Sequence, residues 1–156
     1  MMDKINYKRL YLELDILNIK VYDYELETCN ALTVLVDGKY YIGINKNSPE
    51  WLRFWLIQHE LEHIKNGTFY HINDDKYIIN KNERITNDAV VTKLGIVTTI
   101  LEWLNKGADK EEICSYYNLP LEIYDHCINY IKRKTLTSLH KYVDLLCYKN
   151  KLERKY

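Results

Sequence analysis

The pattern of apolar and polar residues predicts a small β-sheet in the first third of the chain. Two runs rich in β-branched and aromatic residues, Ala31–Val36 and Lys39–Asn45, are separated by Asp37 and Gly38, a pair typical of a two-residue hairpin turn. A shorter run at residues 19–22, with apolar residues at alternate positions, predicts one further strand. We therefore expect a small antiparallel or mixed sheet.

Apolar residues that recur every three or four positions predict helices over most of the remaining chain. Between the second and third of these helices, a stretch rich in aromatic and polar residues, 67–81, predicts a loop. The predicted fold class is α+β, with one domain over residues 1–156, the sheet within residues 1–94 and a helical part over residues 95–156. The predicted helices span residues 3–17, 49–66, 82–94, 96–105, 110–118, 121–133 and 137–154.

The predicted helix that begins at Pro49 contains the sequence HExxH. Ser48 can cap the start of this helix, Pro49 suits its first position, and Gly67 is placed to end it. His59 and His63 are four residues apart, so their side chains project from the same face of the helix. The helical context therefore brings the two imidazoles together.

Two imidazoles arranged in this way can bind one zinc ion. Glu60, which follows the first histidine, can then act as a catalytic base toward a zinc-bound water rather than as a metal ligand. The motif is short enough to occur by chance, and two surface histidines on an amphipathic helix are the alternative interpretation. A third metal ligand elsewhere in the chain would favour the zinc site.

Such a ligand is available in the next predicted helix, for which Asn82 would be the N-cap. Glu83 would lie in the first turn, where its carboxylate completes a His-His-Glu set and leaves one zinc position open. Asn87, one turn later, can accept a hydrogen bond from a ligand imidazole and fix its tautomer. The helix dipole also favours a carboxylate near a helix N-terminus, which would explain Glu83 without a metal.

The order of these features, from the hairpin through the HExxH helix and an aromatic loop to a second helix, resembles the ImmA/IrrE-type metallopeptidases. The resemblance covers most of the chain, and the residues that carry it are His59, Glu60, His63, Glu83 and Asn87. It implies a zincin-like active-site helix, Zn²⁺ as the cofactor and endopeptidase activity. It also implies a protein substrate, a repressor-like regulator of a phage or another mobile element.

Three positions depart from the family pattern. Glu62 stands immediately before the second histidine, where the family commonly has glycine, and Thr86 stands where it usually has alanine. Ile85 occupies a position at which many members have a second glutamate, so Glu83 is the only acid there that can serve as a ligand. None of these differences removes a predicted ligand or the predicted base.

Peptide hydrolysis also requires a hydrogen-bond donor for the oxyanion besides the metal. The predicted loop offers three side chains that can donate, Tyr70, His71 and Tyr77, although each of them could instead pack within the loop or face solvent. The strand segment 40–44, which leads into the HExxH helix, could present an exposed edge to a substrate peptide. An ordinary strand packed against the helices is an equal alternative for this segment.

Composition indicates a cytoplasmic protein of one domain, with 156 residues of which 47% are hydrophobic. The chain has no signal-peptide pattern and no apolar stretch long enough to span a bilayer, so we expect no membrane partner. The cysteines are widely spaced without any CxxC pair, which predicts reduced thiols rather than disulfides or a second zinc site. These cysteines are Cys29, Cys114, Cys127 and Cys147.

The helical part gives weaker indications of a partner. Residues 110–133 predict a helix, a short turn and a second helix, an arrangement similar to a helix-turn-helix. Residues 132–156 hold eight basic and two acidic residues in a chain of zero net charge, which suits nucleic acid or an acidic protein surface. A solvated helix face has this composition more often, so direct nucleic-acid binding stays open. The small core of the helix pair would be Ile113, Tyr117, Leu119, Ile123 and Ile128.

Three functions are therefore compatible with the sequence. The first is a zinc endopeptidase that cleaves a specific repressor-like protein. The second is a non-catalytic module that binds DNA or a repressor and retains a vestigial metal site, and the third is a toxin–antitoxin component. The presence of His59, Glu60, His63 and Glu83 together favours the first, because a degenerate enzyme would be free to lose any of them.

Overall fold

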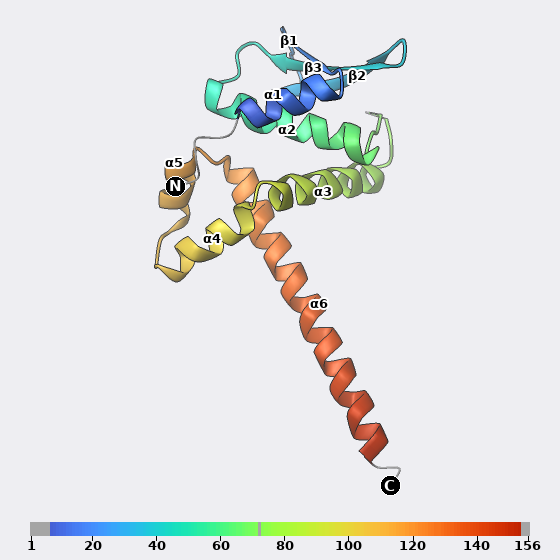
Figure 1. Cartoon of the computed structure of the whole chain (residues 1–156), viewed down its shortest axis with the longest axis vertical. Helices are drawn as coiled ribbons and strands as arrows, with labels where there is room; N and C mark the ends of the chain where they lie inside the picture. The colour runs from blue at the N-terminus through green and yellow to red at the C-terminus, as the bar shows by residue number, and fades with distance from the viewer. Residues whose placement is uncertain (1–6, 72, 154–156) are drawn as a thin grey trace.

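The computed structural model describes residues 7–71 and 73–153, with side chains described as far as Ser138. The described residues form an α+β fold that is mostly helical, with six helices and one three-stranded sheet. Figure 1 shows the sheet, then helices α1 (Tyr7–Ile16) and α2 (Glu50–Asn66), then α3 (Lys76–Lys93), in successive layers. The predicted fold class is confirmed at this level.

The sheet is mixed, with the strand order β1-β3-β2. The hairpin forms as predicted, because β2 (Ala31–Val36) and β3 (Lys39–Asn45) pair antiparallel through a turn in which Asp37 and Gly38 both have positive φ. Strand β1 (Lys20–Tyr24) pairs in parallel with the other side of β3. Strand β3 is therefore central, and the predicted substrate-binding edge at residues 40–44 is wrong, since β2 is the hairpin strand at a sheet edge.

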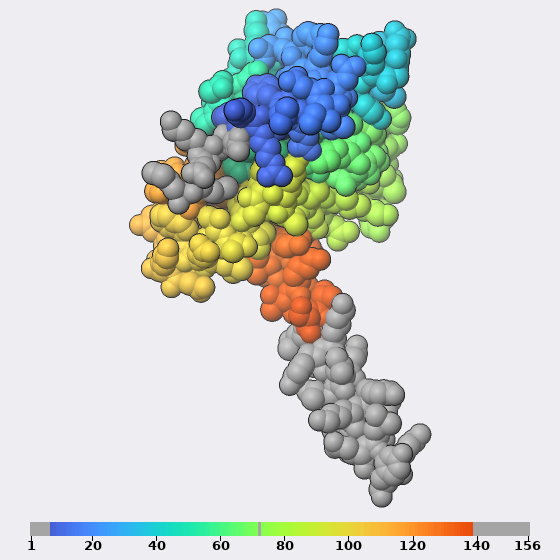
Figure 2. All heavy atoms as spheres, viewed as in Figure 1, coloured from blue at the N-terminus to red at the C-terminus, as the bar shows by residue number. Residues whose placement is uncertain are grey.

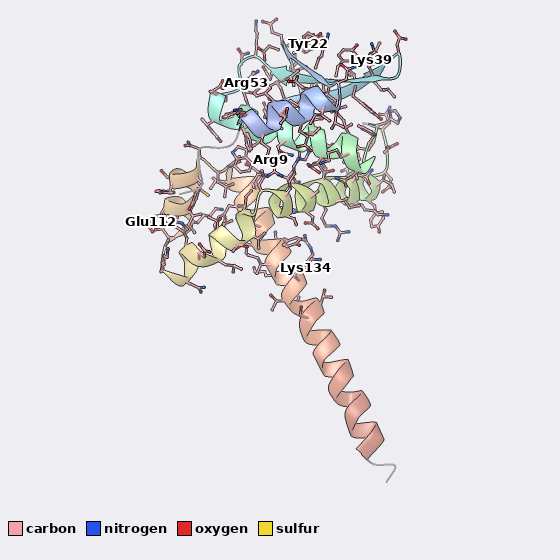
Figure 3. All side chains as sticks on the ribbon, in the orientation of Figure 1. Arg9, Tyr22, Lys39, Arg53, Glu112 and Lys134 are labelled. Carbon is pink, nitrogen blue, oxygen red and sulfur yellow. The ribbon has the colours of Figure 1, made fainter. Side chains whose placement is uncertain are left out.

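The hydrophobic core lies between the sheet and the helices. Ile42 and Ile44 of β3 are fully buried, as are Ile57 and Leu61 on the facing side of α2. Burial of each such side chain contributes roughly 2 kcal/mol to stability. Arg53 of α2 reaches the first strand of the sheet, where its Nη1 lies 2.7 Å from an Asp23 carboxylate oxygen (Figure 3). These contacts fix the orientation of α2 beneath the sheet.

The two ends of α2 differ in how well the sequence predicts them. Gly67 ends the helix as predicted, in the left-handed conformation with φ 61° and ψ 31°, and its N–H donates to the His63 carbonyl. At the other end, Pro49 rather than Ser48 is the N-cap, and no side chain caps the helix. Ser48 Oγ is buried without a hydrogen-bond partner among the described residues, so the predicted serine cap is wrong.

Helix α3 begins six residues earlier than predicted. Its N-cap is Asp75, whose carboxylate accepts a hydrogen bond from the Tyr77 backbone N–H. The predicted loop is correspondingly shorter, and Asn82 is not an N-cap but lies within the helix, where its side-chain amide donates to the Phe69 carbonyl. Glu83 therefore lies in the middle of α3 and not in a first turn.

The remaining helices are α4 (Ile96–Asn105), α5 (Lys110–Tyr117) and α6 (Leu121–Glu153). A capping box between Asp109 and Glu112 starts α5, and three residues separate its end from the start of α6, as in the predicted helix pair.

Helix α6 is a single helix of 33 residues, so the prediction of two helices, 121–133 and 137–154, is wrong. Hydroxyls of Thr135, Thr137 and Ser138 donate to carbonyls four residues earlier, so these side chains bond within the continuous helix and do not cap the start of a new one. Residue 154, the Cys147 thiol and the basic side chains beyond Ser138 lie outside the part that the structure describes.

The first turns of α6 pack against α3, α4 and α5, and the helix then extends away from the body of the molecule (Figures 1 and 2). Lys134 marks the region where the helix leaves the other elements (Figure 3). A search of the described residues finds no helix with both the length and the apolar character needed to cross a membrane.

Candidate metal centre

His59 and His63 lie side by side on α2, as the motif predicts. Their Nε2 atoms are 2.9 Å apart, and the two rings meet edge to face with centroids 4.6 Å apart. The His63 side chain is 7% exposed and the His59 side chain is 21% exposed. The pair therefore lies at the boundary between the core and a surface that small molecules can reach.

The other ring nitrogen of each histidine has an acceptor. His59 Nδ1 donates to Asn87 Oδ1 at 3.0 Å, and His63 Nδ1 donates to the Thr68 carbonyl at 3.0 Å. The Thr68 and Thr86 hydroxyls, 2.6 Å apart, lie within 3.1 Å of the same His63 nitrogen. Hydrogen bonds to Nδ1 place the lone pair of a neutral imidazole on Nε2, the atom that faces the site.

Glu83 of α3 faces both histidines. Its two carboxylate oxygens lie 3.3 Å from His59 Nε2 and 3.2 Å from His63 Nε2. Burial raises the pKa of Glu83, but hydrogen bonds from His59, His63 and Tyr70 outweigh burial and hold this pKa well below its usual range. Burial likewise lowers the pKa of His59, and the hydrogen bond and negative charge of Glu83 outweigh it, so this pKa is raised.

His59, His63 and Glu83 form a group that could hold a metal ion, with ligand atoms all within 4.8 Å of one another. Two tetrahedral ligands at zinc-like bond lengths are about 3.3 Å apart, close to the 2.9, 3.2 and 3.3 Å found between these atoms. The Glu83 side chain is 30% exposed. The three side chains therefore fit a metal ion with one face open to solvent.

Glu60 stands beside this group without belonging to it. Its Oε2 accepts a 2.7 Å hydrogen bond from Thr33 Oγ1 of strand β2, and the residue is only 9% exposed. The negative charge of Glu60 contributes to the raised pKa of both His59 and Tyr70. Strand β2 thus positions the predicted base.

The three predicted oxyanion donors lie in different surroundings. Tyr70 is at the site, where its hydroxyl donates to Glu83 Oε1 at 2.6 Å and its ring packs edge to face against His63. His71 is exposed, and its backbone N–H donates to Asp74. Tyr77 is in the first turn of α3 with 71% of its surface exposed. Among the described contacts, Tyr70 alone of the three joins the metal-binding group.

Glu62, the first departure from the family pattern, does not face the metal-binding group. It is 4% exposed and accepts hydrogen bonds from Gln58 at 3.0 Å and from Lys93 at 2.9 Å. The Lys93 ammonium also binds Glu13 of α1 at 2.6 Å. This charged cluster joins α1, α2 and α3 on the side of α2 that faces the first helix.

Sequence reasoning did not identify Thr33 and Thr68 as parts of the site, and it noted Thr86 only as a departure. All three act through hydroxyl or carbonyl oxygens that orient Glu60 or His63. A threonine carries no sequence pattern that distinguishes this role. Thr68 directly follows the glycine that ends α2, and this position was the one sequence signal that could have placed it near His63.

Comparisons of the chain with protein-family models, with curated proteins and with solved structures find no match.

Proposed function

We propose that this chain is a zinc-dependent endopeptidase that hydrolyses a peptide bond in a specific partner protein. The observation that carries this proposal is the convergence of His59, His63 and Glu83 on one point, with Glu60, the residue after His59, held by Thr33 and outside the ligand group. Two imidazoles and one carboxylate are the ligand set of many catalytic zinc sites, and such sites keep a position open. On this proposal α2 is a zincin-like active-site helix.

A bound zinc ion would polarise the scissile carbonyl and bring the pKa of a coordinated water toward neutrality. Glu60 accepts the proton of the attacking water and then transfers it to the nitrogen of the leaving amine. The hydrogen bond from Thr33 fixes one carboxylate oxygen of Glu60, so the other oxygen is left to take up and release this proton. Asn87 and Thr68 keep the two imidazoles in the tautomer that presents Nε2 to the metal.

Tyr70 is the side chain best placed to stabilise the oxyanion. Its hydroxyl lies against the Glu83 carboxylate in this structure, one hydrogen bond away from the metal-binding group. Burial and the adjacent Glu83 raise the pKa of Tyr70, so the hydroxyl stays protonated and able to donate near neutral pH. A short rotation toward substrate would exchange its acceptor from Glu83 to the developing oxyanion.

The class of protein substrate comes from the resemblance to the ImmA/IrrE-type metallopeptidases. On that basis the partner is a repressor-like DNA-binding regulator of a phage or mobile element. The edge strand β2 supports an extended substrate, because its Thr33 contacts the proposed base while its outer edge lies at the margin of the described sheet. Backbone hydrogen bonds along β2 would align the peptide across the site.

The first test is elemental analysis of the purified protein beside the variants His63→Ala, Glu60→Gln and Tyr70→Phe. We expect about one zinc per chain in the wild type, its loss in His63→Ala and its retention in the other two, since neither side chain is a ligand. Incubation with a repressor encoded next to the chain's own gene should then give cleavage by the wild type, none by Glu60→Gln and slower cleavage by Tyr70→Phe.

Two results would contradict the proposal. If the wild-type protein takes up no zinc even after reconstitution, the proposed metal centre is wrong. If cleavage persists in Glu60→Gln, Glu60 is not the catalytic base. A protein that binds DNA or the repressor strongly, with a steep salt dependence and no sensitivity to Glu60→Gln, would instead be the non-catalytic binding module.

A further inference from the structure

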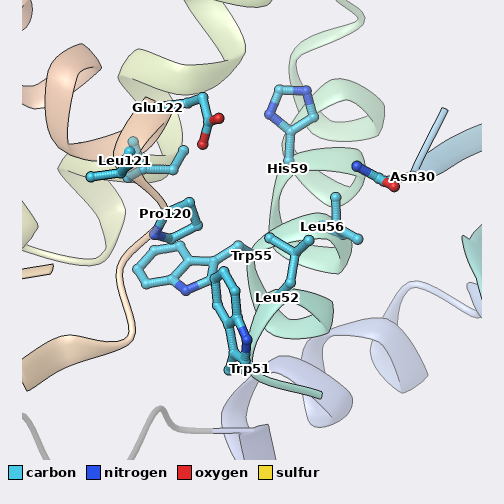
Figure 4. A pocket seen from close by; sticks show the side chains of 10 residues that line it. Asn30, Trp51, Leu52, Trp55, Leu56, His59, Pro120, Leu121 and Glu122 are labelled. Atoms are coloured by element: carbon cyan, nitrogen blue, oxygen red, sulfur yellow. The ribbon is translucent and has the colours of Figure 1, made fainter. Parts of the chain in front are cut away.

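An apolar groove of about 500 Å³ adjoins the metal-binding group. Its floor is one face of α2, where Trp51, Leu52, Trp55 and Leu56 follow one another toward His59. Figure 4 shows these side chains between Asn30 on one side and Pro120, Leu121 and Glu122 on the other. The groove therefore lies between the start of β2 and the start of α6, with a metal-binding histidine at one end. The lining is completed by Ile123.

Burial and a hydrogen bond hold Trp55 in place within the groove lining. Trp55 is 4% exposed, and its indole N–H donates to the Asn118 carbonyl in the turn before α6 at 3.0 Å. Trp51 of α2 and Leu121 of α6 both line the groove, and they are 43% and 52% exposed although both are large and apolar. Exposed large apolar side chains that line one hollow are a feature of ligand-binding sites.

Two parts of the proposed active site, His59 and strand β2, border this groove. His59 belongs both to the metal-binding group and to the groove wall. Asn30 lines the groove and directly precedes β2, the edge strand whose Thr33 contacts Glu60. A peptide aligned along β2 with its scissile bond at the metal would therefore extend from Thr33 past Asn30 into the apolar hollow.

The distances along α2 from His59 to the groove residues determine which substrate position reaches the groove. A helix rises about 1.5 Å per residue, so Trp55 and Trp51 lie roughly 6 and 12 Å along the axis from His59. An extended peptide advances about 3.3 Å per residue, which makes these distances equal to about two and four residues. We propose that this groove binds a large apolar side chain of the substrate, located two to four residues from the bond that is cleaved. This inference rests on the proposed peptidase function.

Peptide hydroxamates provide a direct test, because the hydroxamate occupies the open metal position and the peptide extends from it. Two series of glycine tetrapeptides, with the hydroxamate at either end, would carry a single Phe at each successive position. Binding to the zinc-loaded protein would be followed by calorimetry. In one of the series, Phe at the second to fourth position is expected to tighten binding about tenfold or more over the all-glycine peptide.

Two variants should remove this preference while leaving the all-glycine hydroxamate unaffected. Trp51→Ala deletes part of the floor, and Leu121→Asp places a charge in the groove at the first residue of α6, where the helix dipole favours a carboxylate. Leu12→Ala is the matched control, because Leu12 is also large, apolar and 58% exposed but does not line the groove. It should keep the full preference for Phe.

Equal affinity for all peptides in both series would overturn the inference, as would a preference for Phe that survives in both groove variants. The same peptides with a carboxamide in place of the hydroxamate separate this inference from the peptidase proposal. If hydroxamates bind no better than carboxamides, the proposed metal centre is contradicted. The groove is then judged by whether the carboxamide peptides prefer Phe in a manner that depends on Trp51.

Discussion

At the scale of single residues, the proposed metal site depends on the groups that orient its ligands as well as on the ligands themselves. His59 and His63 follow from a motif, but their ring orientation comes from Asn87 and from the carbonyl of Thr68. Without these acceptors, each imidazole could rotate or place its proton on Nε2, and the metal would have to displace that proton. Metal affinity should therefore respond to changes that leave all three ligands in place.

Asn87→Ala tests this dependence. The variant removes the acceptor for His59 Nδ1, and we expect zinc to bind about 10- to 100-fold more weakly with the ligand set intact. Competition with a fluorescent zinc chelator would measure the change. Asn80→Ala is the matched control, because Asn80 is an exposed asparagine on the same helix. Equal zinc affinity in the two variants would show that the Asn87 hydrogen bond does not orient the ligand.

At the scale of elements, the site requires α2 and α3 to keep a fixed spacing, since the two histidines and Glu83 come from different helices. Part of this spacing is set by the charged cluster that joins α1, α2 and α3. Lys93 of α3 lies between Glu62 of α2 and Glu13 of α1, and Lys65 approaches both carboxylates. The cluster therefore supports the metal-binding geometry without contacting it.

The cluster should make stability depend on pH through Glu13. Burial raises the pKa of Glu13, but hydrogen bonds from Lys65 and Lys93 outweigh burial, so this pKa is lowered in the folded protein. Its stabilising effect is present above the unfolded-state pKa and is lost as pH falls through the lowered folded-state value. Glu13→Gln should thus cost about 1 kcal/mol of unfolding free energy at pH 7 and almost nothing in strong acid.

Urea denaturation of the wild type and Glu13→Gln at both pH values would measure this difference, with the exposed Glu27→Gln as the control. A deficit that is the same at both pH values would mean that the charge of Glu13 is not what stabilises the fold.

The elements that the sequence predicts well are those with local signals. The turn at Asp37 and Gly38 and the end of α2 at Gly67 depend on backbone conformations that few residues adopt easily. The start of α3 was missed because its cap, Asp75, precedes a polar and aromatic stretch that has no clear helical period. The central place of β3 also has no local signal, because parallel pairing with β1 is decided by packing.

The site residues likewise divide into those that a local sequence pattern predicts and those that it does not. His59, His63 and Glu83 were predicted from spacing and chemistry, and the structure brings them together. Tyr70 was one of three equal candidates, and only the path of the loop distinguishes it from the others. The Thr33 contact with Glu60 joins a strand and a helix 27 positions apart, so no local pattern could have predicted it.

At the scale of the whole molecule, the first half of α6 belongs to the body and the second half does not. Asp88 of α3 binds both His126 at 2.7 Å and Arg133 at 2.6 Å, and Cys127 is fully buried. By Leu136 the side chain is already 57% exposed. The body should therefore be stable without the end of the helix.

Removal of residues 139–156 tests this expectation. The melting temperature should fall by less than about 3 °C, since the described contacts of α6 with other helices come from its earlier turns. Zinc affinity should also be unchanged. Differential scanning calorimetry of both proteins would measure this, and a much larger loss would mean that the distal turns support the body. Cleavage of peptides by the shortened protein, without cleavage of the intact partner, would assign partner recognition to the removed segment.

The Glu62–Lys93 contact also has a consequence for how this chain can diverge. A buried carboxylate and its ammonium partner are tolerated together, whereas the loss of either one weakens the balance of charge at the junction of three helices. A glycine at position 62 would leave Lys93 with Glu13 as its remaining partner, and a neutral residue at position 93 would leave Glu62 with the more distant Lys65, at 3.6 Å. The two positions should therefore covary, so that chains sharing this fold carry the charged pair or neither member of it.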